Sequence, residues 1–382
     1  MSIRQMFPGS IVKPGFNPLA AQTPSYTYYL YTWGRNNDGQ LGLGNTTSYS
    51  SPKQVGSLTT WLNIANGYAF TLATKTDGTL WSWGTGAQGQ LGLGNTTSYS
   101  SPKQIGALTN WASVGCASQA SFAVKTDGTI WSWGAGGSGK LGLGNTTSYS
   151  SPKQIGSLTN WSKVIGGTQS GFAIKTDGTL WAWGVNTNGL LGLGDTVSRS
   201  SPVQVGVLTN WLNLSAGYYN TLASKTDGTL WSWGRGSFGC LGLGNTTNYS
   251  SPKQIGALTS WLNVASAYFA GFAIKTNGTA WAWGQNNVGQ LGQGNTTNYS
   301  SPMQIGALTN WSTISSTPSL GGSSTAVLAI KTDDTLWAWG SNAQGQLGSG
   351  NLIDRSSPVQ VGALSTWESV KCFGQFVTAL GY

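Results

Sequence analysis

The sequence repeats itself about every fifty residues, and this period constrains the fold more than any other feature of the chain. Residues 81–106 read WSWGTGAQGQLGLGNTTSYSSPKQIG, and the segment fifty residues later differs from them at only a few positions. Each copy carries a Trp-x-Trp-Gly element, with Tyr as the first aromatic of copy one, and a lone Trp further on; together they account for all 20 tryptophans. Self-similarity at a fixed period is typical of solenoids and propellers.

Four short β segments fit into each repeat. In the copy that begins at Trp111 they read WASVGCAS, SFAVKT, TIWSWG and SPKQIG. Asp127-Gly128, between the second and third segments, favours a tight hairpin because a type I′ turn needs positive φ at both central positions. No helical period is found along the chain. Four strands taken seven times predict an all-β fold, a seven-bladed β-propeller with four antiparallel strands per blade.

The two ends of the repeat array complement each other. Residues 28–34 resemble a third strand with no first or second strand before it, while residues 376–382 resemble a second strand with nothing after it. We therefore predict a closing blade shared between the terminal segments, which removes two open sheet edges. The predicted domains are a Pro-rich arm over residues 1–26 and the propeller over residues 27–382.

The repeat unit resembles a known family. Its elements are W-x-x-hydrophobic, then F-A-I-K-T-D-G-T-L-W-x-W-G, then G-Q-L-G-L-G-N, and this pattern is similar to the repeat of the regulator of chromosome condensation family. The resemblance implies a seven-bladed propeller that serves as a protein-binding scaffold. Members include a guanine-nucleotide exchange factor, a plant ultraviolet photoreceptor and secreted β-lactamase inhibitors. Exchange activity is not expected here, since the chain has no histidine and no long wedge-like insertion.

Residues suited to catalysis or metal binding are scarce. The chain has no histidine, one glutamate, and aspartates that lie mostly in turns, so general acid–base chemistry has few candidates. Cys116, Cys240 and Cys372 are far apart and form no C-x-x-C motif, which indicates buried or incidental thiols. We expect no enzyme activity, no cofactor and no metal site.

The net charge of +9 has two interpretations, a nucleic-acid track or a diffuse rim. One lysine ends the second strand of most repeats, close to an acidic or Asn turn residue, and a further four lie on the outer strand. We predict a solvated rim and no nucleic-acid partner. The lysines are Lys75, Lys125, Lys175, Lys225, Lys275 and Lys331 on the second strand, and Lys53, Lys103, Lys153 and Lys253 on the outer strand.

Residues 1–26 contain four prolines, no acidic residue and no apolar run long enough for a secretion signal or a membrane span. This arm either docks on a protein partner or straps across its own propeller. The nearly identical, charge-poor repeats are similar in style to phage structural and tail proteins. The main functional prediction is accordingly a non-catalytic, virion-associated propeller attached through its arm. The alternative is a cytoplasmic or extracellular protein-binding regulator or inhibitor scaffold of the same propeller family.

Two segments vary between the copies: one after the lone Trp and one after Trp-Gly. In a four-stranded meander both connections leave the sheet at the same end, so both are predicted to lie on one face of the disc. They carry aromatic and arginine side chains together with Asn and Gln, a mixture suited to a protein or glycan ligand. The predicted ligand-binding residues are Tyr68, Phe70, Tyr218, Tyr219, Tyr268, Phe269, Phe373, Arg35 and Arg235.

Overall fold

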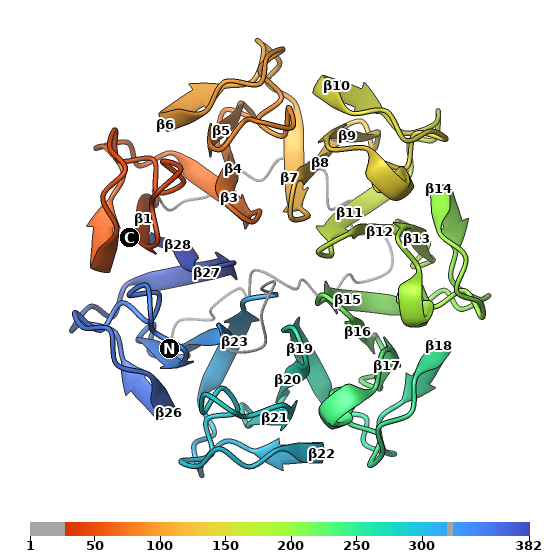
Figure 1. Cartoon of the computed structure of the whole chain (residues 1–382), viewed down its shortest axis with the longest axis vertical. Coiled ribbons are helices and arrows are strands. Elements are labelled where there is room, and N and C mark those ends of the chain that lie inside the picture. The colour runs from red at the N-terminus through yellow and green to blue at the C-terminus, as the bar shows by residue number, and fades with distance from the viewer. Residues whose placement is uncertain (1–26, 319–323) are drawn as a thin grey trace, which may run out of the picture.

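The computed structural model describes residues 27–318 and 324–382, which form a ring of seven four-stranded antiparallel sheets (Figure 1). The predicted propeller is confirmed. We number the blades in chain order: blade 1 contains β3–β6, blade 2 β7–β10, blade 3 β11–β14, blade 4 β15–β18, blade 5 β19–β22 and blade 6 β23–β26. The closing blade contains β1, β2, β27 and β28. The predicted arm and its two docking alternatives lie outside the described residues.

The first strand of each blade begins at the lone Trp and lies nearest the central axis (Figure 1). All seven of these Trp side chains are buried, so each one anchors its strand in the packing between blades. These inner strands are β3 (Trp61–Asn66), β7 (Trp111–Cys116), β11 (Trp161–Gly166), β15 (Trp211–Ala216), β19 (Trp261–Ser266), β23 (Trp311–Ser316) and β27 (Trp367–Phe373).

The two middle strands of each blade form its core. Every residue of each second strand is buried, because both faces of the sheet are covered by neighbouring blades. The second strands are β4 (Phe70–Lys75), β8 (Ala120–Lys125), β12 (Ser170–Lys175), β16 (Asn220–Lys225), β20 (Ala270–Lys275), β24 (Ala326–Lys331) and β28 (Phe376–Gly381). The third strands are β1 (Tyr29–Gly34), β5 (Leu80–Gly84), β9 (Ile130–Gly134), β13 (Leu180–Gly184), β17 (Leu230–Gly234), β21 (Ala280–Gly284) and β25 (Leu336–Gly340).

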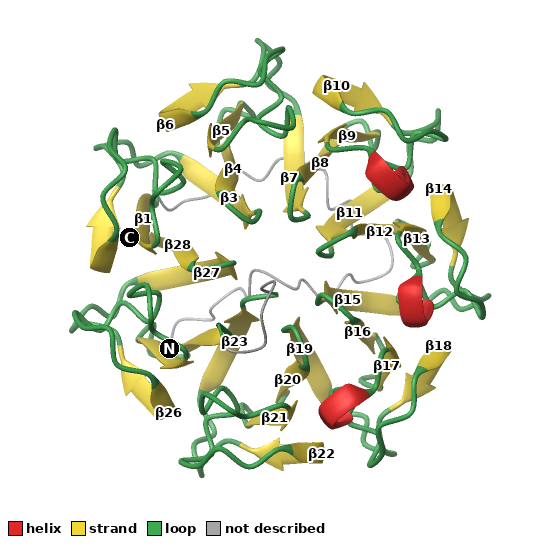
Figure 2. Ribbon diagram, viewed as in Figure 1, coloured by secondary structure: helices red, strands yellow, loops and turns green. Residues whose placement is uncertain are grey.

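The outer strand pairs only with the third strand, which explains how it tolerates a proline. These edge strands are β2 (Tyr49–Gln54), β6 (Tyr99–Gln104), β10 (Tyr149–Gln154), β14 (Arg199–Gln204), β18 (Tyr249–Gln254), β22 (Tyr299–Gln304) and β26 (Arg355–Gln360). Among the described residues the only helical elements are three short 3-10 turns in blades 2, 3 and 4 (Figure 2). They are η1 (Gly137–Gly139), η2 (Thr187–Gly189) and η3 (Ser237–Gly239).

The closing blade has the composite order that the chain ends predict. Its strands follow the order β2-β1-β28-β27, so the N-terminal and C-terminal strands meet at the centre of the sheet. Strand β28 pairs with β1 from Tyr29↔Gly381 to Gly34↔Phe376, without a shift in register. The ring is therefore closed by backbone hydrogen bonds between the two ends of the described chain (Figure 1).

Neighbouring blades are joined by the second Trp of the Trp-x-Trp-Gly element. The indole Nε1 of Trp83 donates to the carbonyl oxygen of Gln40 at 2.9 Å, and the same bond recurs from Trp133 to Gln90 at 3.0 Å. The Leu-Gly-Leu-Gly loop approaches this indole so closely that a Cβ on Gly92 would lie 2.6 Å from Nε1 of Trp133. The copied loop is thus part of the blade interface, and its glycines leave room for the next blade.

The lysines at the ends of the second strands are buried, so the predicted solvated rim is wrong for this group. Their exposed fractions run from 4% to 8%. The Nζ of Lys75 lies 3.6 Å from the ring centroid of Trp81 and 4.9 Å from that of Trp61. The two indoles cover the ammonium and its stem, which explains why charged side chains are accepted here. The outer-strand lysines, such as Lys53 and Lys103, are exposed as predicted.

Candidate binding face

The two variable segments of each blade do lie at the same end of its sheet. The amide of Thr85, after the third strand of blade 1, donates to the carbonyl oxygen of Ala69, before its second strand, at 2.9 Å. The corresponding bond in blade 4 joins Arg235 to Tyr219 at 2.8 Å. We call this side of the disc the variable face. The opposite side, which carries the Asp-Gly turns, is called the turn face.

An aromatic cluster forms on the variable face where blades 4 and 5 meet. Tyr218 and Tyr219 come from the loop between β15 and β16, and Tyr268 and Phe269 come from the loop between β19 and β20. The ring centroids of Tyr219 and Phe269 are 5.2 Å apart at an interplanar angle of 14°, so these two rings stack across the blade boundary. Tyr268 lies 5.1 Å from Tyr218 and 5.2 Å from Tyr219. Two neighbouring repeats thus build a continuous aromatic surface.

Arg235 completes this cluster from the loop that follows β17. Its guanidinium carbon lies 4.9 Å from the ring centroid of Tyr219 and 5.2 Å from that of Phe269. The Nε of Arg235 donates to the hydroxyl of Ser237 at 2.8 Å, which fixes the side chain in this position. A cation held against aromatic rings, with its remaining N–H groups available, is suited to a carboxylate or carbonyl of a bound molecule.

Phe238 belongs to the same cluster, although it is not one of the residues predicted from the sequence. Its ring lies 5.1 Å from Phe269, and the side chain is 44% exposed. Its φ of 59° places a bulky residue in the left-handed region, where the corresponding residues of blades 2 and 3 are Ser138 and Asn188. The sequence does carry a signal for it, because Phe238 is the only aromatic residue in any of the segments that follow Trp-Gly.

The phenols of Tyr218 and Tyr268 stay protonated at neutral pH. Burial, then the neighbouring Tyr219, raise the pKa of Tyr218, while a hydrogen bond from Gln169 to its hydroxyl at 3.0 Å acts in the opposite direction. Burial and a hydrogen bond with Tyr219 raise the pKa of Tyr268 to about 12. Their hydroxyls therefore offer neutral hydrogen-bonding groups at the edge of an apolar surface.

Two of the predicted site residues are core residues instead. Phe70 is 0% exposed and packs among Trp111, Trp133 and Leu91 between blades 1 and 2. Phe373 is 3% exposed. Phe70 is the first residue of a second strand and Phe373 the last residue of an inner strand, so the variable loops are shorter than the sequence comparison predicts. Phe269 is also largely buried, but its ring contacts place it within the cluster.

Tyr68 and Arg35 lie on the variable face but away from the cluster. Tyr68 is in blade 1 and Arg35 in the closing blade, whereas the cluster lies where blades 4 and 5 meet (Figure 1). Tyr68 is half-buried, and its amide donates to the carbonyl oxygen of Ser118 at 3.0 Å. Arg35 forms an ion pair with Asp38 at 3.6 Å. The structure therefore divides the predicted residues into one compact group and separate side chains elsewhere on this face.

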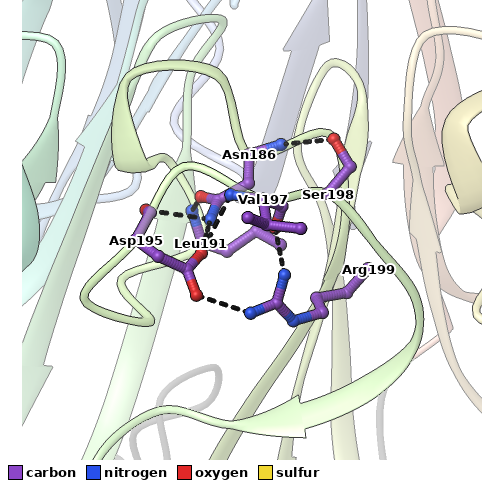
Figure 3. Close-up of polar contacts among 6 residues, drawn as sticks. All are labelled: Asn186, Leu191, Asp195, Val197, Ser198 and Arg199. Carbon is purple, nitrogen blue, oxygen red and sulfur yellow. Dashed lines mark hydrogen bonds and ion pairs between the residues drawn. The ribbon is translucent and has the colours of Figure 1, made fainter.

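The Asn residues two positions after Trp-Gly have a structural role rather than the ligand-binding one expected of the variable amides. Asn186 shows the arrangement (Figure 3): its Nδ2 donates to the backbone and side-chain oxygens of Asp195, and its Oδ1 accepts from the amide of Leu191 at 2.8 Å. The guanidinium of Arg199 donates to Oδ2 of Asp195, the carboxylate oxygen that does not accept from Asn186. Where this Asn is absent the position is Gly, as at Gly86, whose Cβ would lie 2.1 Å from the carbonyl oxygen of Thr97.

The described residues carry no group of three His, Cys, Asp or Glu side chains that could hold a metal ion. The three cysteines are free and buried, and burial raises the pKa of Cys240 and Cys372 to about 12, so these thiols stay protonated. Within the described ranges, no helix has the length and apolarity needed to cross a membrane.

Comparison with protein families gives seven matches to the regulator of chromosome condensation (RCC1) repeat, over residues 29–74, 77–124, 127–174, 177–224, 227–274, 277–328 and 333–380. A second model of the same repeat matches residues 212–240. Each match begins in a third strand or just before it and ends in the second strand of the next blade, so the family unit is offset from the blade. The comparison with curated proteins gives no significant match.

Solved propellers resemble the whole chain. The chain is similar to human WBSCR16, with 19% identity, a TM-score of 0.81 and coverage of 93% of this chain and 98% of that one. It is also similar to Prp20p from Saccharomyces cerevisiae, a protein described as binding Gsp1p and histones, with 17% identity, a TM-score of 0.84 and coverage of 98% and 96%. A structure of Kap60 bound to yeast RCC1 (Prp20) matches with 17% identity, a TM-score of 0.83 and coverage of 100% and 94%. At these identities the likeness concerns the fold.

Proposed function

Because the chain belongs to the regulator of chromosome condensation repeat family, we propose that it is a non-catalytic scaffold that binds a protein partner through its variable face. The contact is centred on the aromatic cluster of Tyr218, Tyr219, Tyr268, Phe269 and Phe238, with Arg235. This is the second of the two functions considered from the sequence, the regulator or inhibitor scaffold.

The observation that carries the proposal is that two neighbouring blades combine their side chains into one cluster. Tyr219 and Phe269 stack across the boundary, and Phe238 and Arg235 extend the surface from a third loop. Protein interfaces concentrate their binding energy in Tyr, Trp and Arg side chains near the centre of the contact. Neutral drift of unconstrained loops would not favour such a group at one blade boundary.

A protein ligand is favoured over a glycan by two considerations. Prp20p is described as binding Gsp1p and histones, and the other yeast structure is a complex with Kap60, so protein binding is known for proteins of this fold. In addition, Tyr219 and Phe269 cover each other's faces, whereas a sugar ring needs a free aromatic face for stacking.

The virion-associated function gains no support from the comparisons and stays a prediction from the style of the repeats. The same holds for attachment through residues 1–26. Both concern where the propeller is used, and neither changes what its variable face offers to a partner.

A quantitative capture experiment tests the proposal. The variant combines Tyr218→Ser, Tyr219→Gln, Tyr268→Thr and Phe269→Gln, which copy the residues found at the same places in blades 2 and 3. Because other blades fold with these residues, the variant is expected to keep its fold. The control is Tyr249→Arg, which removes an aromatic side chain from the outer strand of blade 4 and copies Arg199 of blade 3.

Proteins captured by the parent from extracts of its source cells are identified, and their affinities are then measured with purified partners. We expect a partner whose affinity falls at least about tenfold in the four-site variant and is unchanged in the control. Equal binding of every purified partner by parent and variant would overturn the proposal. Binding of the parent to immobilised glycans, without any protein partner, would place the ligand in the other class.

A further inference from the structure

Arg235 and Arg35 stand at the same place in two repeats, directly after Trp-Gly, but their surroundings differ. The Nη2 of Arg35 lies 3.6 Å from Oδ2 of Asp38, three residues further along the chain. In blade 4 the residue at the place of Asp38 is Phe238. No carboxylate within residues 27–318 and 324–382 forms an ion pair with Arg235. Blade 4 thus keeps the arginine and has an aromatic ring in place of its local counter-charge.

The guanidinium of Arg235 is held in position without using most of its donors. Its Nε donates to the hydroxyl of Ser237 at 2.8 Å, and its carbon atom lies 4.9 Å from the ring centroid of Tyr219. Neither Nη atom has a hydrogen-bond partner in the part of the chain that the structure describes. A guanidinium presents its N–H groups as a planar fork that matches both oxygens of a carboxylate. Because the side chain is already held, little rotamer freedom is lost when an anion binds.

The chain around the aromatic cluster carries no acidic residue. Neither Asp nor Glu occurs from residue 228 to residue 332, a stretch that contains β17 to β24 and therefore all of blade 5. Even the hairpin turn of blade 5 has Asn277, where blades 1 to 4 have Asp. On the other side of blade 4, Asp195 of blade 3 is paired with Arg199. The loops that build the cluster therefore supply no carboxylate to neutralise Arg235.

An exposed apolar surface lies next to this charge. The ring of Phe269 lies 5.2 Å from the guanidinium carbon of Arg235 and 5.1 Å from the ring of Phe238, so it joins the two side chains. Phe238 itself is exposed. A molecule that places an anionic group at Arg235 can therefore cover Phe238 with its neighbouring part, and this removes apolar area from water.

We propose that the partner of the variable face presents an acidic peptide segment, in which an Asp or Glu side chain pairs with Arg235 and an adjacent apolar side chain packs on Phe238. This inference rests on the function proposed above and names the chemistry of its ligand. A carboxylate at Arg235 meets a charge-assisted donor and no competing anion. The variable loops of blades 4 and 5 contain no lysine, so the single arginine matches one carboxylate better than the phosphate backbone of a nucleic acid.

Selection of short randomised peptides on the purified parent protein tests the proposal. The peptides are acetylated and amidated, so that only side chains supply carboxylates. Each selected peptide is made again with Asn and Gln in place of Asp and Glu, and the affinities of both forms are measured at constant ionic strength. We expect the selected peptides to carry an acidic residue beside an apolar one, and the amide forms to bind at least about tenfold more weakly.

Two variants change the charge of the site with residues that other repeats have at these places. Arg235→Gln copies Gln285 of blade 5, and Phe238→Asp copies Asp38 of the closing blade. The first variant removes the cation, and the second gives Arg235 a carboxylate of its own at the spacing of the ion pair in the closing blade. We expect both variants to bind the acidic peptides about as weakly as the parent binds the amide forms. Thermal melting verifies that each variant is folded.

The matched control is Lys253→Met, which copies Met303 of blade 5 and removes one positive charge from the exposed outer strand of blade 4. It should bind the acidic peptides as the parent does. An equal loss of affinity in this control would contradict the proposal, because it would show a dependence on net charge instead of on Arg235.

Three further outcomes would overturn the acidic segment: a peptide pool that yields no acidic binder, equal affinity of the acidic and amide forms, or undiminished binding by Arg235→Gln. Tighter binding of single-stranded DNA than of any selected peptide would also overturn it, in favour of a nucleic-acid ligand. A partner protein whose affinity falls in the four-site aromatic variant but not in Arg235→Gln would leave the scaffold function standing and refute the acidic segment alone.

Discussion

The blade interfaces and the aromatic cluster are built from the same fifty-residue repeat, but the interfaces use the same Trp and Gly residues seven times, whereas the cluster is made once, by two neighbouring blades. At an interface, the Trp-Gly indole donates to a carbonyl oxygen of the preceding blade, as Trp283 does to Cys240 at 3.0 Å. In the cluster, Tyr219 and Phe269 stand where blade 2 has Gln119 and blade 3 has Gln169. The blade interface requires the same Trp and Gly in every repeat, while the variable face accepts several residue types at one position.

The physical reason for this difference is the space available. The amide of Gly94 donates to the carbonyl oxygen of Ser150 in the next blade at 2.8 Å, and a Cβ on Gly89 would lie 2.7 Å from the Cα of the same serine. At such distances backbone meets backbone and no side chain fits. A loop on the variable face has solvent on one side and can therefore accept larger side chains.

The largest effect is expected from breaking the closing interface. Deletion of residues 376–382 removes β28, which pairs with both β1 and β27. The deletion therefore leaves two open sheet edges. We expect the melting temperature to fall by more than about 10 °C, or the chain not to fold. Deletion of Tyr382 alone is the control, with a much smaller expected change. A seven-residue deletion that melts within a degree or two of the parent would contradict the closure.

Two glycine substitutions, each adding one methyl group, test the difference between a blade interface and an open loop. Gly92 and Gly106 both have positive φ, 71° and 59°, but a Cβ would lie 2.6 Å from Trp133 Nε1 at the first and meets nothing within 4 Å at the second. We expect Gly92→Ala to cost about 3 kcal/mol in free energy of unfolding and Gly106→Ala about 1 kcal/mol, measured in urea. Equal costs would show that backbone conformation alone, and not the interface, fixes these glycines.

On the variable face, in contrast, we expect one substitution to raise the free energy of unfolding. Phe238 has a φ of 59°, where blade 3 has Asn188 with a φ of 60°. Asn adopts this conformation more readily than a bulky residue does, so Phe238→Asn should raise the free energy of unfolding by about 0.5–1 kcal/mol while weakening partner binding. Ser138→Asn is the control for the conformational effect alone. A destabilised Phe238→Asn would mean that the contact of its ring with Phe269 outweighs the strain.

The smallest effect concerns the constant turns of the turn face. Partial burial tends to raise the pKa of Asp127, but hydrogen bonds from Thr129 and the charge of Lys125 outweigh it and hold the pKa below its usual value. Because the pKa of Asp127 is lower in the folded than in the unfolded protein, the ionised carboxylate stabilises the fold at pH values above the unfolded pKa. This contribution is lost as the pH falls through the folded pKa. Asp127→Asn, which copies Asn277, should therefore lose less stability than the parent on acidification below about pH 4. Denaturation midpoints at neutral and acid pH measure this, and Asn277→Asp should change them in the opposite sense.

The propeller, its seven blades, its composite closure and the common face of the variable loops could all be predicted from the chain, because each follows from period and connectivity. The burial of the second-strand lysines could not, since Lys175 becomes buried only when Trp161 and Trp181 fold over it. The wrong assignment of Phe70 had a similar cause. Its position at the start of a strand, rather than its type, decides that it points into the core.

By itself, the sequence determined the architecture, because a repeated unit that cannot bury its own Trp residues must stack on copies of itself until the ring closes. It also determined which segments are free to vary. Only the tertiary structure decided which of those segments meet: Tyr219 and Phe269 are fifty residues apart, yet they stack at a blade boundary. Packing of neighbouring blades brings such residues together, and a linear pattern carries no measure of the distance between side chains of different repeats.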